Sequence, residues 1–457
     1  MLLPTLFDRF VAKAPLCVMA RALLERALQA EALDRLFEQL ATVQYTRELL
    51  FSSVVELISQ VALRAFPSVR QAYRDDPQRY GVSLAAVYAK LNQLEPPLGP
   101  ALVRHSAQHM QALIAELGTT LPPWRAGYRV KILDGNHLAG TQHRLAPLRH
   151  TAAAPLPGQV LAVLDPQSRL LLDLVACEDA YTQERALLES VLPVVETNDV
   201  WVADRNFCTP KFLAGLADRG SCFVIREHSQ LNIRSLGVRR PVGRSATGLV
   251  FEQEAEVTEE TSGRRVRVRR VVVVLDQPTR DGDREVAVLT NLPPEVADAT
   301  AVAELYLTRW TIEVCFGELT TALRCEIESL GYPRAALFSF AVAALASNVF
   351  AAVRAALRAE HGTERVEAEL SVPQVALDVA GAYQGMMIAL PPAEWAPLAA
   401  LSLVDFAQWL RALAAGVAWE RVKKGKRRPR KPSPKRPSAR KQRHVSTARV
   451  LQNRQNR

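Results

Sequence analysis

The sequence predicts an α/β fold in which a mixed sheet is flanked by helices. Three observations lead to this fold class. Apolar residues recur at helical spacing from residue 1 to about 122, as they do along helices that bury one face. Strand-like and helical runs then alternate over residues 123–227, the pattern of a sheet covered by helices. Strand-like runs follow one another over residues 228–300 and predict a β-rich insertion, before helical patterns resume over residues 301–420.

Composition limits the classes of protein to which the chain can belong. Its 457 residues are 49% hydrophobic, enough for a large core and for two or three domains. Six cysteines occur without a Cys-x2-Cys pair, which argues against a zinc ribbon or a disulfide framework and favours a reducing compartment. The N-terminus lacks the basic start and long apolar run of a signal peptide. We therefore expect a cytoplasmic, nucleoid-associated protein.

Positive charge gathers at the C-terminal end. Residues 421–457 hold 16 Lys and Arg and no Asp or Glu, whereas the whole chain has a net charge of +10, so residues 1–420 are net acidic. Such a segment has too little apolar surface to fold alone. We predict a disordered arm that contacts a polyanion, with a merely solubilising tail as the alternative.

The N-terminal region, residues 1–122, is predicted to be a helical DNA-binding domain. Its most informative helix begins after Ser83, a residue type that caps helices by accepting a backbone hydrogen bond. Tyr88 and Lys90 fall outside the apolar stripe of that helix. We expect them to be exposed, as on the recognition helix of a helix-turn-helix. An ordinary helical hairpin has the same pattern, so both interpretations stay open.

Two predicted strands end in an aspartate. Tyr128–Leu133 leads into Asp134, and Asp199–Ala203 leads into Asp204. Acidic side chains at strand ends lie on the rim of a sheet, where binding sites form. An Asp-Gly turn and a local Asp–Arg pair are the simpler alternatives. In the β-rich insertion, Arg264–Leu275 alternates valine and arginine, and its arginine face either follows a DNA backbone or is solvated.

The helical region after the insertion contains the most informative stretch of the chain. Tyr306, Arg309 and Glu313 stand at i, i+3 and i+7, so on one continuous helix they share a face. An arginine can hold a phosphate with its planar fork, and a carboxylate can bind a metal. A solvated Arg–Glu pair is the alternative. Farther along, Ala335–Val353 carries no charge, but its Ser and Asn residues favour a core helix over a membrane span.

Asp134, Asp204 and Glu313 together suit a pair of divalent metal ions. Two ions about 3.5–4 Å apart need carboxylate oxygens from separate elements, and they stabilise both the attacking and the leaving oxygen of a phosphoryl transfer. Mg²⁺ prefers a few carboxylates together with water and phosphate oxygens. These three residues would supply that arrangement.

Three segments resemble bacterial DDE transposases of the insertion-sequence-four family, whose catalytic domain has the ribonuclease H-like fold. The third segment matches the family's Tyr-x2-Arg-x3-Glu signature, and the family shares the β-rich insertion between the second aspartate and the glutamate. The likeness extends over roughly residues 125–355, so the resemblance implies a catalytic domain split by the insertion into residues 123–227 and a part within 301–420. The segments are Ile132–Gly135, Val202–Phe207 and Tyr306–Glu313.

The resemblance implies a transposase that cleaves double-stranded DNA at transposon ends and transfers the freed 3′-hydroxyl to target DNA. Asp134, Asp204 and Glu313 would be catalytic and bind two Mg²⁺ or Mn²⁺ ions. Arg309 would hold a phosphate, and Tyr306 the same backbone or a displaced base. A homodimer in a synaptic complex, without membrane contact, is also implied. A metal-dependent nuclease without strand transfer, or an inactive transposase-derived DNA-binding protein, stays an alternative.

One position departs from the family pattern. The signature continues to a lysine, but Thr320 stands there, and a threonine offers no cation to a phosphate. Arg324, one turn farther, would lie within about 20° of Glu313 around an ideal helix. We therefore predict that Arg324 makes this DNA contact.

Overall fold

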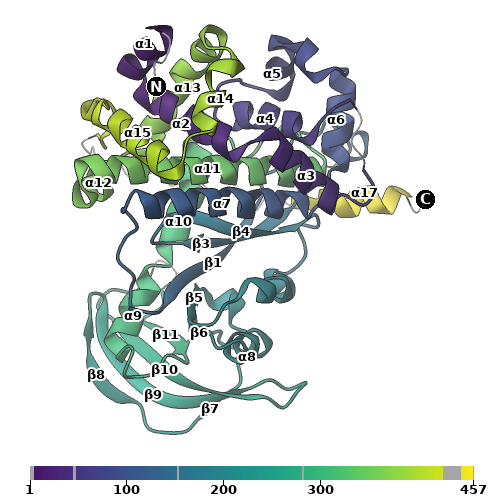
Figure 1. Cartoon of the computed structure of the whole chain (residues 1–457). Helices are drawn as coiled ribbons and strands as arrows, with labels where there is room; N and C mark the ends of the chain where they lie inside the picture. The colour runs from purple at the N-terminus through teal and green to yellow at the C-terminus, as the bar shows by residue number, and fades with distance from the viewer. Residues whose placement is uncertain (1–4, 45–47, 152–153, 280–281, 426–443, 456–457) are drawn as a thin grey trace.

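A mixed sheet of ten strands and a thick layer of helices make up the molecule (Figure 1). The computed structural model describes residues 5–44, 48–151, 154–279, 282–425 and 444–455. The helices gather at one end of the sheet, above β4, β3 and β1, and the β-rich part extends from the other end. This arrangement confirms the predicted fold class.

Five strands have the order and directions of a ribonuclease H-like sheet. The order is β4-β3-β1-β5-β6, in which β1 pairs antiparallel with β3 and parallel with β5. The strands β3 and β4 form a hairpin, whereas β5 and β6 are parallel and are connected through α8. The bounds are β1 (Arg129–His137), β3 (Gln159–Asp165), β4 (Leu170–Cys177), β5 (Asp199–Ala203), α8 (Pro210–Asp218) and β6 (Cys222–Arg226).

Strand β1 is longer than predicted, and Asp134 lies within it rather than at its end. The parallel ladder with β5 ends at the pair Leu133–Ala203. The antiparallel ladder with β3 continues through Asp134 to His137. Because β3 supplies partners for the residues beyond Leu133, β1 remains a strand after β5 has ended.

The β-rich region extends the same sheet. Strand β11 pairs antiparallel with β6, and β10, β9, β7 and β8 follow outward. In β10 the predicted alternation holds at its start, where Val266 and Val268 are buried. Arg269 is ion-paired with Glu252 at 2.6 Å, so the arginine face is partly neutralised within the sheet. The bounds are β7 (Ile233–Ser235), β8 (Arg240–Ser245), β9 (Gly248–Thr258), β10 (Arg265–Leu275) and β11 (Glu285–Thr290).

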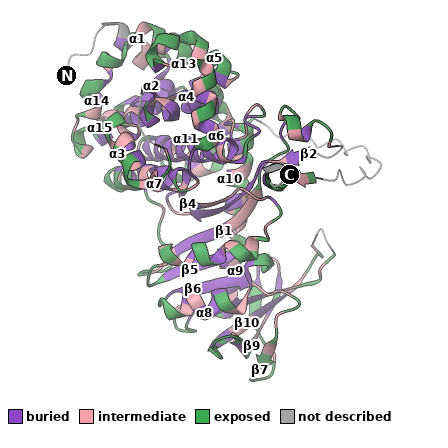
Figure 2. Ribbon diagram, turned by 90° about the vertical axis from the view of Figure 1, so that its right-hand side faces the viewer, coloured by how far each residue is buried: buried purple, intermediate pink, exposed green. Residues whose placement is uncertain are grey.

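Helices from both ends of the chain pack around α11, a 29-residue helix. Within the described residues it alone is long and apolar enough to cross a membrane, yet 94% of its most apolar window is buried. Figure 2 shows this helix as a buried ribbon inside the helical layer, as expected of a core helix. The bounds are α1 (Thr5–Lys13), α2 (Pro15–Ala27), α3 (Ala30–Leu40), α4 (Phe51–Ala62), α5 (Val69–Asp75), α6 (Leu84–Gln93), α7 (Leu98–Glu116), α11 (Pro333–His361), α12 (Thr363–Glu369), α13 (Val372–Ala389), α14 (Ala396–Ala399), α15 (Leu403–Ala415) and α16 (Trp419–Val422).

The predicted recognition helix is α6, and the layer partly buries it. Ser83 caps the helix as expected, because its hydroxyl accepts a backbone N–H of the first turn. Lys90 is not free, since its ammonium donates to the Leu49 carbonyl at 2.8 Å and lies 4.7 Å from the centre of the Phe37 ring. Tyr88 packs against the core. The prediction that Tyr88 and Lys90 are exposed is therefore wrong. The apolar stripe of α6 belongs to a helix packed into the helical layer and not to a free recognition surface.

The end of the predicted disordered tail is folded. Residues 426–443 lie outside the described residues, but 444–455 form a short strand and a helix (yellow in Figure 1). The Ser446 hydroxyl donates to the Asp179 carboxylate at 2.6 Å, and Arg449 donates to its other oxygen at 2.7 Å. The prediction was wrong here because the charge is concentrated before this segment. The elements are β12 (His444–Ser446), which pairs parallel with β2 (Ala154–Leu156), and α17 (Thr447–Gln455).

Candidate active site

Asp134 and Asp204 lie side by side on neighbouring strands. Leu133 of β1 pairs with Ala203 of β5, and each aspartate is the next residue along the chain. Leu133 and Ala203 are buried in the core on one face of the sheet. Because successive side chains of a strand point to opposite faces and neighbouring strands are about 4.8 Å apart, both aspartates are directed to the other face at one point.

The Asp134 carboxyl is mostly buried, and its pKa is raised from 3.8 to about 7. Burial is the largest cause, and the charges of Asp204 and Glu184 raise the pKa further, while Arg309 lowers it. The Asp204 effect agrees with the strand register. Asp204 itself accepts the Asn206 backbone N–H at 2.7 Å, which holds the turn after β5.

Tyr306 and Glu313 belong to two helices, so the prediction of one continuous helix was wrong. Helix α9 (Ala299–Leu307) ends before Arg309, and α10 (Trp310–Thr321) begins after it. In the connecting turn the Arg309 N–H bonds to the Tyr306 carbonyl at 3.1 Å, a tighter spacing than in an α-helix. Arg309 keeps helical backbone angles, so the chain continues in nearly the same direction and the three side chains still reach one site.

Arg309 connects two of the predicted catalytic carboxylates. Its Nη1 donates to Asp134 Oδ2 at 3.1 Å, and its Nη2 donates to Glu313 Oε1 at 2.6 Å. The Arg309 side chain is 12% exposed, whereas that of Glu313 is 38% exposed. The Nε of Arg309 is buried and bonds to no described residue. The guanidinium therefore offsets part of the negative charge, and one of its donors is buried without a partner among the described residues.

Glu184 is a fourth carboxylate at the site, and sequence reasoning missed it. It begins a 3₁₀-helix, Glu184–Ser190, between β4 and β5. A Cβ on Gly135 would lie 1.9 Å from Glu184 Oε1, so the glycine leaves space for this carboxylate. Its other oxygen accepts from Asn206 Nδ2 at 3.3 Å. No local signal distinguishes Glu184 from other acidic residues, because only the fold brings it here.

A cavity of about 450 Å³ reaches Arg309, between the α9–α10 turn and strands β10 and β11. Tyr306, Arg309, Trp310 and Arg226 line it together with apolar side chains of the two strands. Burial raises the pKa of Tyr306, so its phenol stays protonated at neutral pH. Trp310 is 59% exposed. The cavity therefore offers aromatic surface and two guanidiniums beside the acidic cluster.

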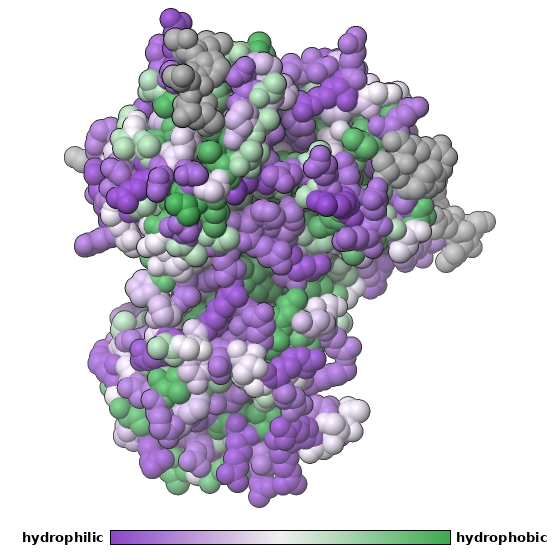
Figure 3. Space-filling view, in the orientation of Figure 1, coloured by the Kyte–Doolittle hydropathy of each residue, from purple (hydrophilic) through white to green (hydrophobic). Residues whose placement is uncertain are grey.

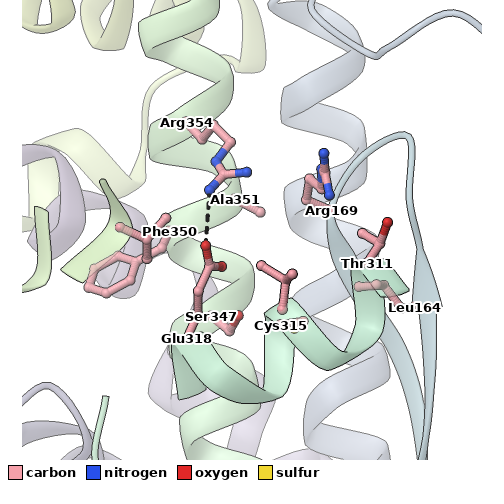
Figure 4. Close-up of a pocket in the computed structure, with 11 residues that line it drawn as sticks. Leu164, Arg169, Thr311, Cys315, Glu318, Ser347, Phe350, Ala351 and Arg354 are labelled. Atoms are coloured by element: carbon pink, nitrogen blue, oxygen red, sulfur yellow. Dashed lines mark hydrogen bonds and ion pairs between the residues drawn. The ribbon is translucent and has the colours of Figure 1, made fainter. Parts of the chain in front are cut away.

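A smaller cavity behind α10 holds charged residues whose partners lie within the protein. Its volume is about 40 Å³, space for about one water molecule. Figure 4 shows Arg354 pointing toward Glu318 across it, and the two groups are 3.3 Å apart. Arg169 and Arg358 are ion-paired with Glu367. The Arg354–Glu318 pair holds α11 against α10, and the pairs of Glu367 hold α12 against α11 and the turn before β4.

Asp134, Asp204 and Glu313 match divalent metal ions in donor chemistry. All three offer the carboxylate oxygens that Mg²⁺ and Mn²⁺ prefer. In the part of the chain that the structure describes, no three Asp, Glu, His or Cys side chains are already placed to hold a metal. Glu313 is instead paired with Arg309.

Arg324 lies beyond the end of α10 rather than on its surface. The helix ends at Thr321, so the ideal-helix geometry behind the prediction does not apply. The Arg324 guanidinium donates to the Pro67 carbonyl. Thr320 is exposed, and its hydroxyl donates to the Phe316 carbonyl at 2.9 Å.

All six predicted site residues fall within a segment that matches a known family. Residues 125–349 match the family model described as a transposase DDE domain. None of the curated proteins compared with the chain matches it in sequence. Among solved structures, a piggyBac transposase synaptic complex with hairpin DNA is similar with 12% identity and a TM-score of 0.40, over 88% of this chain and 85% of that chain. Residues 125–349 are therefore similar to a transposase DDE domain.

Proposed function

We propose that the protein is a DDE transposase of the insertion-sequence-four family that acts on double-stranded DNA. The observation that carries the proposal is the register of β1 and β5, which sets Asp134 beside Asp204. Arg309 joins Glu313 to this pair. Carboxylates from three separate elements around one point suit phosphoryl transfer assisted by two metal ions. In Figure 3 the molecule narrows between the helical layer and the β-rich part, where Figure 1 places α9 and α10.

In this proposal the carboxylates of the site would bind metal ions, and Arg309 and Tyr306 would contact the DNA strand. Asp134, Asp204 and Glu313 would bind two Mg²⁺ or Mn²⁺ ions, which supply an activated nucleophile and charge stabilisation when bound. Arg309 would grip a phosphate oxygen, a role that suits its planar fork and its unpartnered Nε. Tyr306 would contact the same backbone or a displaced base in the adjoining cavity.

Two exchanges at phosphorus would make up the reaction. In the first, a water oxygen bonds to phosphorus while the bond to the 3′-oxygen breaks, which frees a 3′-hydroxyl at the transposon end. In the second, that hydroxyl bonds to the phosphorus of another strand and releases its 3′-oxygen. A homodimer that holds two ends would bring both cuts into one synaptic complex. We further propose a cytoplasmic, nucleoid-associated location.

Joining of DNA strands is the decisive test. The protein is incubated with Mg²⁺, a target plasmid and duplex DNA from the flanks of its own gene, and joined products are expected. Asp204→Asn should abolish cleavage and joining. Glu318→Gln is the matched control, because Glu318 lies on the same helix as Glu313 but pairs with Arg354, so it should keep both activities. Cleavage without joining would indicate a nuclease, and a folded wild-type protein without metal-dependent cleavage would overturn the proposal.

A further inference from the structure

We infer that Arg64 and Arg324 form a second phosphate-binding point for DNA, at the end of α10 where Thr320 provides no cation. This inference rests on the proposed function. The Arg64 Nη2 donates to the carbonyls of Thr320 and Leu323, both at 3.0 Å. A residue of the N-terminal helices thus contacts the helix that carries Glu313.

The contact is reciprocal. The Arg324 N–H donates to the Ala62 carbonyl at 2.8 Å, and its guanidinium donates to the Pro67 carbonyl. Arg64, which follows α4, is therefore held by carbonyls at the end of α10. Arg324, which follows α10, is held by carbonyls at the end of α4 and just after it. Both guanidiniums are therefore held at the junction of the two segments.

The backbone at Arg64 is in a conformation that favours glycine. Arg64 has φ of +60°, the left-handed region that an arginine rarely adopts. It follows the C-cap residue Leu63, a position where helices commonly end with glycine. The next residue donates back to the Gln60 carbonyl at 3.0 Å, which closes the helix end. Glycine would adopt this backbone conformation more readily than arginine. We therefore attribute the presence of an arginine at this position to the contacts of its side chain.

The two guanidiniums bond to carbonyl oxygens rather than to carboxylates. Among the described residues, neither Arg64 nor Arg324 takes part in an ion pair, and their acceptors are carbonyl oxygens without net charge. The acidic side chain of Glu328, farther along this segment, bonds to Gln142 at 2.8 Å. Arg64 is exposed. A phosphate can therefore meet two positive charges with donors to spare, as charge-assisted hydrogen bonding requires.

The position of this pair fits one strand of DNA that also passes the catalytic carboxylates. Thr320 stands seven residues after Glu313 on α10, which is about 10.5 Å along the helix and about 20° around it. Successive phosphates of a strand are about 3.4 Å apart along the duplex axis. A strand lying along α10 would thus meet Arg64 and Arg324 about three nucleotides from the phosphate nearest Glu313.

The salt dependence of DNA binding tests the inference. Affinity for a labelled duplex is measured by fluorescence anisotropy from about 50 to 200 mM KCl, where each lost phosphate contact should reduce the slope by about 0.9. Arg64→Gly removes the charge and relieves the left-handed backbone, so it should lower the slope without lowering the melting temperature. Arg324→Gln should do the same, and the double variant should lose about twice as much.

Two controls separate this inference from the proposed function. Arg411→Gln removes an exposed arginine on α15 that is paired with Glu360, and it should leave the slope unchanged. Asp204→Asn should stop cleavage but keep the wild-type slope. If wild type cleaves DNA while a folded Arg64→Gly protein keeps the full slope, the phosphate contact is refuted and the transposase proposal stands. If wild type neither binds nor cleaves DNA, both fail.

Discussion

The side-chain amide of Asn348 makes the hydrogen bonds to edge strand β4 that a further strand would otherwise make. Strand β4 is an edge strand, and the Leu171 N–H and C=O within it bond to Asn348 Oδ1 at 2.8 Å and Nδ2 at 2.9 Å. Asn348 lies on α11 and is fully buried. Its Nδ2 also donates to the Ser106 hydroxyl of α7 at 3.0 Å. One side chain therefore joins the sheet to two helices.

Asn348→Leu should destabilise the protein by about 3–4 kcal/mol. The leucine has a similar size, so packing is nearly kept. It leaves the N–H and C=O of Leu171 buried without partners, and each such group costs about 1–3 kcal/mol. The Ser106 hydroxyl keeps its bond to the Val103 carbonyl at 2.8 Å, so it adds little to the loss.

Urea unfolding followed by circular dichroism measures this loss. Ser339→Ala is the control, because the Ser339 hydroxyl lies on the same helix, is fully buried and has no hydrogen-bond partner in the described structure. Its removal should leave the free energy of unfolding unchanged or slightly raised. If Asn348→Leu changes the free energy of unfolding by less than about 1 kcal/mol, the argument that Asn348 satisfies the edge strand is wrong.

Four further substitutions test two buried charges and the space around two glycines. Because burial raises the pKa of Asp134 from 3.8 to about 7, the folded state binds the proton more tightly than the unfolded state. Stability should therefore fall as pH rises from about 4 to above 7, by at most about 4 kcal/mol. Asp134→Asn should remove this fall in melting temperature, and parallel pH profiles would contradict it. Gly248→Ala should destabilise by about 2 kcal/mol or more, since its Cβ would lie 2.0 Å from a backbone oxygen of β10. Gly317→Ala, on an open helix face, should stabilise by about 0.5–1 kcal/mol, and denaturant midpoints in the reverse order would refute both. Glu367→Gln should cost about 3–5 kcal/mol, because it leaves the buried Arg358 without its charged partner; unchanged unfolding would show that the pair is not needed.

Local patterns were sufficient for the strands and for two of the acidic residues. Alternation and turn residues located the strands before Asp134 and Asp204, because these signals act over a few residues. The extension of β1 beyond Leu133 was not predictable in this way, because it depends on pairing with β3. The break at Arg309 was missed for a related reason, since a turn with helical backbone angles leaves the spacing of apolar residues almost unchanged.

Residues that the fold alone brings together carried no sequence signal. Glu184 reaches the site because Gly135 leaves space for it. Arg64 reaches α10 only through the packing of N-terminal helices against it. For Lys90 a local signal was present but misleading. Its position outside the apolar stripe predicted exposure, whereas the Phe37 ring and a backbone carbonyl hold its ammonium against the helical layer. Residues 444–455 were assigned to a disordered tail because charge was counted over residues 421–457 together, and most of that charge lies before residue 444.

Arg309 is bonded to two of the carboxylates that a metal would need. A guanidinium and a divalent cation both require carboxylate oxygens, so a metal bound at this site would compete with Arg309 for Asp134 and Glu313. A phosphate gives the guanidinium another partner, and its buried Nε already has no acceptor among the described residues. DNA should therefore release Glu313 to a metal, and by linkage metal and DNA should bind more tightly together than alone. Mn²⁺ affinity of the wild-type protein, measured with and without duplex DNA, should rise when DNA is present. In Arg309→Ala the affinity without DNA should already be high, and equal affinities in all four measurements would refute the competition.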